Sequence, residues 1–196
     1  MIKIACIGDS LTYGYLLENR TTTCYPATLN ELLGEDYAVG NFGVNGTTLL
    51  KSSSQSFWHH ENFTLSTLFD PDIVIIMLGT NDASHENFTT TDHYLADYKE
   101  MINHYRNLPA KPHIYMATPP AVFPPKDPSM STLPTAHIDL LASSVRELGK
   151  QLRISVIDIN KLTSNAPQLF IADGIHMNQS GAKFIATAMY RELSKK

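Results

Sequence analysis

Residues 73–78 read "IVIIML", an apolar run with no polar position. A strand with one face in water alternates apolar and polar residues, so this run predicts a strand buried on both faces. Such a strand belongs in a parallel sheet with helices on both sides. Further strands are predicted at 2–7, 37–42, 113–117 and 154–159, where β-branched and aliphatic residues gather.

Three segments between or after these strands have apolar residues at helical spacing. Asp92 and Asn178 stand where they could cap the first and last of these helices. Strands that alternate with helices favour an α/β fold with a five-stranded parallel sheet, and 196 residues suit a single domain of three layers over 1–196. The stripes are Leu95, Tyr98, Met101, Ile102 and Tyr105; Ile138, Leu141, Val145, Leu148 and Leu152; and Phe184, Ile185, Ala188, Met189 and Leu193.

Composition argues against several functional classes. The net charge is −4 and the cations do not cluster, so we expect no nucleic-acid partner. No apolar stretch approaches the ~20 residues of a membrane span, and the first residues lack the pattern of a secretory signal, so we expect a cytoplasmic protein without membrane insertion. His59, His60 and Glu61, and His85 beside Glu86, lack the spacing of a zinc motif, so no metal or other cofactor is predicted.

Polar groups follow four of the predicted strands at their carboxyl ends. Because these ends of parallel strands meet at one edge of a sheet, where α/β proteins bind ligands, the groups are expected to lie together. They are "GDS" at 8–10, "GVNG" at 43–46, "GTND" at 79–82 and, after a short linker, "DGIH" at 173–176.

Three of these residues suit nucleophilic catalysis. The Ser10 hydroxyl needs a base to remove its proton, and His176 is the candidate base. Asp173 lies three residues earlier, so its carboxylate can reach the near ring nitrogen and leave the far one for Ser10. The negative charge of a tetrahedral intermediate needs donors, which the N–H groups of Ser10 and Gly43 and the Asn81 amide could supply as an oxyanion hole.

Several neighbouring residues have weaker assignments. Asp9 is expected to hold the loop around Ser10 through a hydrogen bond, and Asp82 to play a structural role. Asn45 either supports the oxyanion loop or occupies a turn. Trp58 either stacks on a sugar ring or covers the sheet edge. The proline-rich residues 118–134 are expected to form a loop folded over the sheet edge.

The four blocks, in this order and spacing, resemble those of the SGNH hydrolases, also called the GDSL esterase/lipase family. The resemblance covers nearly the whole chain and implies a flavodoxin-like three-layer α/β/α sandwich and a serine esterase mechanism. It makes Ser10 the nucleophile, His176 the base, Asp173 its orienting acid, and Ser10, Gly43 and Asn81 the oxyanion hole. Met177 departs from the proline that commonly follows the histidine in this family.

The middle segments look like members that act as acetylesterases on decorated sugars. The resemblance thus implies hydrolysis of short, acetyl-type esters on a small-molecule or glycan substrate through an acyl-enzyme. Two alternatives remain open: a lysophospholipase or thioesterase with a long acyl site, and a non-catalytic flavodoxin-like binder of a phosphate or a carbohydrate.

Overall fold

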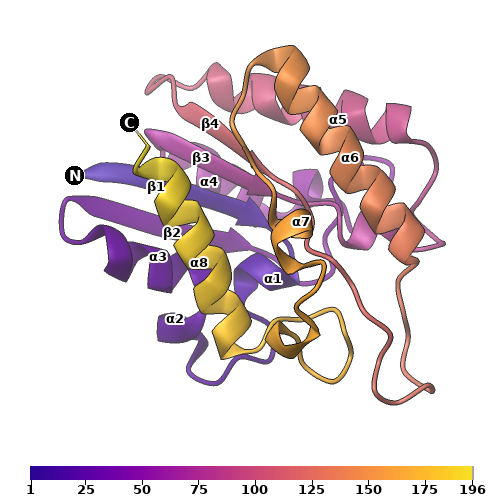
Figure 1. The fold of residues 1–196 in the computed structure, drawn as a ribbon. Helices are drawn as coiled ribbons and strands as arrows, with labels where there is room; N and C mark the ends of the chain where they lie inside the picture. Colours follow the sequence, from indigo (N-terminus) through magenta and orange to yellow (C-terminus); the bar gives the residue numbers. More distant parts are fainter. Residues whose placement is uncertain (196) are drawn as a thin grey trace.

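A computed structural model describes residues 1–195 of the chain and shows one five-stranded sheet. All neighbouring strands are parallel and their order is β2-β1-β3-β4-β5 (Figure 1). This order confirms the predicted flavodoxin-like α/β fold. The strands are β1 (Ile2–Gly8), β2 (Tyr37–Gly43), β3 (Ile73–Met77), β4 (His113–Ala117) and β5 (Val156–Ile157).

Helices connect and cover the strands. Within residues 1–195, none of them has both the length and the apolar character needed to cross a membrane. The α-helices are α1 (Ser10–Tyr13), α2 (Arg20–Thr23), α3 (Tyr25–Leu33), α4 (Glu61–Leu68), α5 (Thr91–Arg106), α6 (Thr135–Leu152), α7 (Ile159–Thr163) and α8 (Gln179–Leu193), and the 3₁₀ helices are η1 (Phe57–His59), η2 (Asn81–Ala83) and η3 (Pro167–Leu169).

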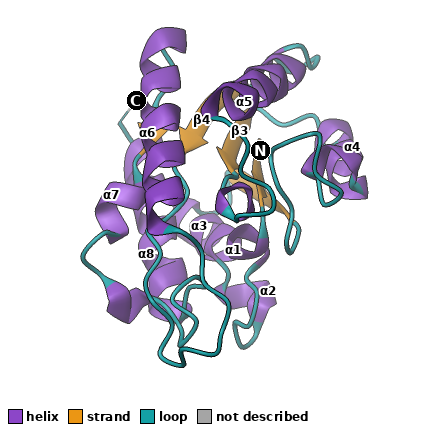
Figure 2. Ribbon diagram, turned by 90° about the vertical axis from the view of Figure 1, so that its right-hand side faces the viewer, coloured by secondary structure: helices purple, strands orange, loops and turns teal. Residues whose placement is uncertain are grey.

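The two faces of the sheet bury two separate apolar clusters, as alternation along a strand requires. Ile4 and Cys6 of β1 point to the face that packs against α3 and α8. Ala5 and Ile7 point to the opposite face, which packs against α5 and α6. Figure 2 shows α4 and α8 on opposite sides of the strands, so the sheet is the middle of three layers.

The strands and the three helices with marked stripes lie where the sequence predicts them, with local differences. Strand β5 has two residues rather than six, because the Asp158 side chain accepts the Lys161 N–H and starts α7. The prediction that Asp92 caps α5 is wrong: the Thr90 side chain accepts a backbone N–H there and the helix begins one residue before Asp92. Asn178 caps α8 as predicted. Phe184 belongs to the α8 stripe yet is 36% exposed.

The proline-rich segment 118–134 meets the expectation of a covering loop only in part. Residues 118–122 are buried after β4, whereas residues 126–132 are exposed. The buried part therefore belongs to the carboxyl edge of the sheet, and the rest extends into solvent.

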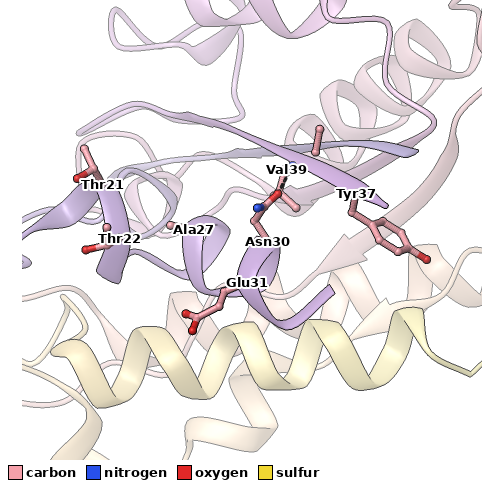
Figure 3. Close-up of a pocket in the computed structure, with 8 residues that line it drawn as sticks. Thr21, Thr22, Ala27, Asn30, Glu31, Tyr37 and Val39 are labelled. Atoms are coloured by element: carbon pink, nitrogen blue, oxygen red, sulfur yellow. Dashed lines mark hydrogen bonds between the residues drawn. The ribbon is translucent and has the colours of Figure 1, made fainter. Parts of the chain in front are cut away.

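A groove of about 550 Å³ runs along the edge strand β2, beside α2 and α3 (Figure 3). Within it the Asn30 side chain accepts the Val39 N–H at 2.9 Å, which satisfies one hydrogen-bonding position on the outer side of this edge strand. None of the polar residues at the strand carboxyl ends lines this groove. The groove is therefore separate from the edge where the sequence predicts the functional site.

Candidate active site

Ser10, His176 and Asp173 form a hydrogen-bonded chain at the carboxyl edge of the sheet. The Ser10 Oγ lies 2.9 Å from His176 Nε2, and His176 Nδ1 lies 2.6 Å from Asp173 Oδ2. Ser10 begins α1, separated from β1 by Asp9 alone, and is 6% exposed. The structure thus brings together the hydroxyl, imidazole and carboxylate that the sequence singles out, although Ser10 and His176 are 166 residues apart in the chain.

The carboxylate of Asp173 is held in its ionised form by the turn that it starts. Burial opposes ionisation, but the His176 ring and the backbone N–H groups of His176 and Ile175 donate to it, and together they lower the pKa of Asp173. An ionised Asp173 keeps a proton on Nδ1 of the neutral imidazole. His176 Nε2 is then free to accept a proton from Ser10.

The proline-rich segment braces this turn. The Phe123 N–H donates to the Gly174 carbonyl at 2.9 Å, and the Lys126 N–H donates to the Ala172 carbonyl at 2.8 Å. Gly174 has a φ of +71°, and a Cβ there would overlap the Phe123 carbonyl oxygen. Only glycine fits between the two segments.

Asp9 makes the predicted hydrogen bond within the Ser10 loop. Its Oδ1 accepts the Leu11 N–H at 2.9 Å, and the residue is fully buried. Burial raises the pKa of Asp9 to about 7, although the Leu11 N–H and the nearby Thr80 side chain lower it. Its Oδ2 has no regular hydrogen bond among the described residues. This oxygen is therefore costly to leave charged.

Gly43 ends β2 beside α1, and packing allows only a glycine at this position. A Cβ at this position would overlap the Tyr13 backbone nitrogen. The sequence predicts an oxyanion donor at Gly43, whereas the close neighbour that requires a glycine there is the protein's own backbone. The Gly43 N–H donates to Asn41 Oδ1 at 2.9 Å, so an oxyanion would have to share or displace that contact.

Asn81 opens η2 and has one side-chain N–H engaged. Its Nδ2 donates to the Thr47 carbonyl at 2.9 Å, and its backbone carbonyl accepts from Asn87 Nδ2 at 3.0 Å. Because a primary amide carries two N–H groups, one donor remains for a ligand. The next residue, Asp82, is structural as expected: its two oxygens accept successive backbone N–H groups at 2.9 Å.

For Asn45 and Trp58, each with two open interpretations, the structure shows a turn and a set of ring contacts. Asn45 is exposed in the turn that contains Gly46, at φ +76°. The Trp58 ring packs against Phe63 at a centroid distance of 5.0 Å, and the Lys51 ammonium lies 4.2 Å from its centroid. The structure therefore favours a covering role for Trp58 over sugar stacking.

Tyr15 is a neighbour of the site that sequence reasoning missed. Its ring lies 4.8 Å from the His176 ring, centroid to centroid, and the residue is 39% exposed. The hollow that Ser10, Tyr15 and His176 line encloses only about 150 Å³ of empty space, open solvent included. The only signal for Tyr15 is its position five residues after Ser10, just past a short helix.

Comparisons with known proteins match most of the chain to one family model and to a curated relative. The model of the GDSL-like lipase/acylhydrolase family matches residues 6–184. The chain is 32% identical over 202 residues to an acetylxylan esterase from Xylanibacter ruminicola, covering 94% of this chain and 42% of that protein. It thus spans about two fifths of the length of this curated relative.

Two solved structures show the same fold over nearly their full length. A lipase/acylhydrolase from Enterococcus faecalis has a TM-score of 0.80 at 26% identity, covering 98% of this chain and 95% of that one. A carbohydrate acetylesterase family member from Sinorhizobium meliloti has a TM-score of 0.78 at 21% identity, covering 98% and 97%.

Proposed function

The chain belongs to the GDSL-like lipase/acylhydrolase family, and on that premise we propose that it is a serine esterase that removes acetyl groups from carbohydrates. The observation that carries this proposal is the continuous hydrogen-bonded chain from Ser10 Oγ through the His176 ring to Asp173. We assign Ser10 as nucleophile, His176 as base and Asp173 as its orienting acid, within one catalytic domain.

In the proposed reaction, Ser10 Oγ attacks the ester carbonyl carbon while His176 Nε2 takes the hydroxyl proton. The resulting imidazolium is stabilised by Asp173 and then gives its proton to the departing alcohol oxygen, which leaves an acetyl-enzyme. Water, deprotonated by the same imidazole, attacks the acetyl carbon and releases acetate and free Ser10. Both steps pass through an oxyanion.

The oxyanion donors that we assign are the Ser10 N–H, the Gly43 N–H and the free N–H of the Asn81 amide. Asn81 is held in place on both sides, since its other side-chain N–H donates to the Thr47 carbonyl and its backbone carbonyl accepts from Asn87. Gly43 takes part by sharing its N–H between Asn41 and the oxyanion.

Two observations support a short acyl group and a sugar leaving group. The hollow beside Ser10 is small, at about 150 Å³ with open solvent included, so a long acyl chain cannot be buried in it and would not gain the burial that drives its binding. The curated relative is named an acetylxylan esterase. We therefore favour acetylated glycans over the long acyl chains of a lysophospholipase or thioesterase.

The test is hydrolysis of p-nitrophenyl acetate, butyrate and octanoate, together with acetate release from acetylated xylan. We expect kcat/KM to fall steeply with acyl length, and Ser10→Ala to abolish turnover while the unfolding midpoint stays within about 2 °C, as is usual for changes that add no cavity or unpaired charge. A preference for octanoate would favour the long-chain alternative. Wild-type protein without esterase activity on any of these substrates would leave only a non-catalytic binder.

A further inference from the structure

A polar pocket of about 410 Å³ lies between the segment that follows β2 and the segment that follows η2. Every side chain that lines it carries a hydroxyl, an amide or a carboxylate. The lining residues are Ser52, Ser53, Ser54, Glu86, Asn87 and Thr89. Of these residues the sequence analysis names only Glu86, beside a histidine that lacks the spacing of a zinc motif, and "SSS" at 52–54 is an ordinary loop sequence.

Asn87 connects this pocket to the proposed oxyanion site. Its Nδ2 donates to the Asn81 carbonyl at 3.0 Å, and its Oδ1 accepts from the Ser53 hydroxyl at 3.2 Å. One side chain thus spans from the pocket wall to the residue that we assign to the oxyanion. A molecule that contacts Asn87 in the pocket would be linked to the Asn81 backbone carbonyl through this one side chain.

The pocket wall formed by the segment after η2 packs against α6. Phe88 stacks on His137 of α6, with ring centroids 4.0 Å apart and an interplanar angle of 16°. His137 Nδ1 in turn lies 2.9 Å from the Ala83 carbonyl. Because packing already fixes this segment, a ligand that binds against it has less ordering entropy to overcome.

The chemistry of the lining selects a neutral polyhydroxyl ligand. Hydroxyl and amide groups both donate and accept hydrogen bonds, which matches the hydroxyls of a sugar. None of the lining residues is a cation, and Glu86 disfavours a phosphate or another anion. None is apolar either, so an acyl chain gains nothing there.

We propose that this pocket is a glycan subsite, which binds hydroxyl groups of a sugar unit next to the acetylated one. This inference rests on the proposed function and extends it from the ester bond to the sugar chain. Ser54 and Thr89 are exposed and offer their hydroxyls to the ligand, that of Thr89 beside its contact with His93 Nδ1 at 3.4 Å, while Asn87 positions Asn81. The protein should therefore prefer an acetylated oligosaccharide over an acetylated single sugar.

The experiment compares the double variant Ser54→Ala/Thr89→Val with the wild type on acetylated xylo-oligosaccharides and on p-nitrophenyl acetate. Loss of one or two hydrogen bonds should lower the ratio of kcat/KM for the oligosaccharide to kcat/KM for p-nitrophenyl acetate about three- to thirtyfold, mainly through KM. The matched control is Thr64→Val/Ser143→Ala, which removes two exposed hydroxyls from α4 and α6 and should leave the ratio unchanged.

Other results would overturn the inference in recognisable ways. An unchanged ratio in the pocket variant means that the pocket binds no sugar. Equal losses on both substrates mean that the two hydroxyls serve the oxyanion loop. If the wild type hydrolyses p-nitrophenyl acetate but not the sugar ester, the glycan subsite is wrong while the esterase assignment stands. Wild-type protein inactive on both refutes the proposed function itself.

Discussion

Replacement of Asp9 by asparagine should change how the stability of the protein depends on pH. The carboxyl is fully buried next to Ser10, and burial raises its pKa from 3.8 to about 7. Between these two values the folded chain keeps the proton and the unfolded chain loses it. The free energy of unfolding therefore falls as the pH rises from about 4 to about 7, and then levels off.

The expected size follows from the shift. At 1.36 kcal/mol per pKa unit, an increase of about three units amounts to about 4 kcal/mol. The asparagine side chain cannot ionise, and its Oδ1 can still accept the Leu11 N–H. Any cost of the buried amide is the same at each pH. The stability of Asp9→Asn relative to the wild type should therefore increase by about 4 kcal/mol between pH 4 and pH 8.

The assay is equilibrium unfolding in urea at several pH values between 4 and 8. Asp92→Asn, which removes an exposed carboxyl from α5, is the matched control and should give a nearly constant difference. Asp82 is also buried, with a pKa raised by burial to about 6, and its charge is one of the causes that raise the pKa of Asp9, so the measured difference includes the coupling of the two carboxyls. A stability difference for Asp9→Asn that does not change with pH would refute the reasoning.

Three further substitutions test the site. Asp173→Asn should lower kcat by about 10⁴-fold, the loss that the same change causes in a serine protease triad, because the amide no longer fixes the imidazole tautomer; a loss below tenfold in steady-state assays would contradict its role. Asn81→Ala should lower kcat by about 10²–10³ with little change in KM for p-nitrophenyl acetate. Gly174→Ala places a Cβ against the Phe123 carbonyl oxygen and should cost about 1–3 kcal/mol in urea unfolding as well as activity. Gly34→Ala, also at positive φ but with open space around its Cβ, is the control that shows the cost of φ alone.

Much of the fold could be predicted because its signals are local. Apolar runs locate the strands, and stripes locate α5, α6 and α8. The bounds of the short strand β5 could not be predicted, because aliphatic residues also lie just before it, at Ile154, and at the start of α7, at Ile159. Thr90, rather than Asp92, caps α5 because Thr90 has the extended backbone that a cap requires. Threonine and aspartate can both cap a helix, so the sequence alone could not distinguish between the two positions.

The sequence could predict which residues make up the candidate site, but not which contacts they make. Its three central side chains carry the chemistry themselves, so their types and spacing suffice. Gly43 was singled out as an oxyanion donor, but the sequence did not show that packing against the α1 backbone requires a glycine there. Asn87 and Tyr15 could not be found, because their importance depends on which distant segment they face. Such pairings are set by tertiary packing, which a single sequence does not encode locally.

One local hydrogen-bonding pattern nevertheless recurs among the segments that form the candidate site. Asp9, Asn41 and Asp173 each accept, through a side-chain oxygen, the backbone N–H of the residue two positions later, at 2.9 Å in every case. Asparagine and aspartate favour this turn because their short side chains reach that N–H. Each turn redirects the chain next to a residue that we assign to the reaction. The oxygens thus shape the local backbone without any distant contact, and the parallel sheet has only to bring these turns to one edge.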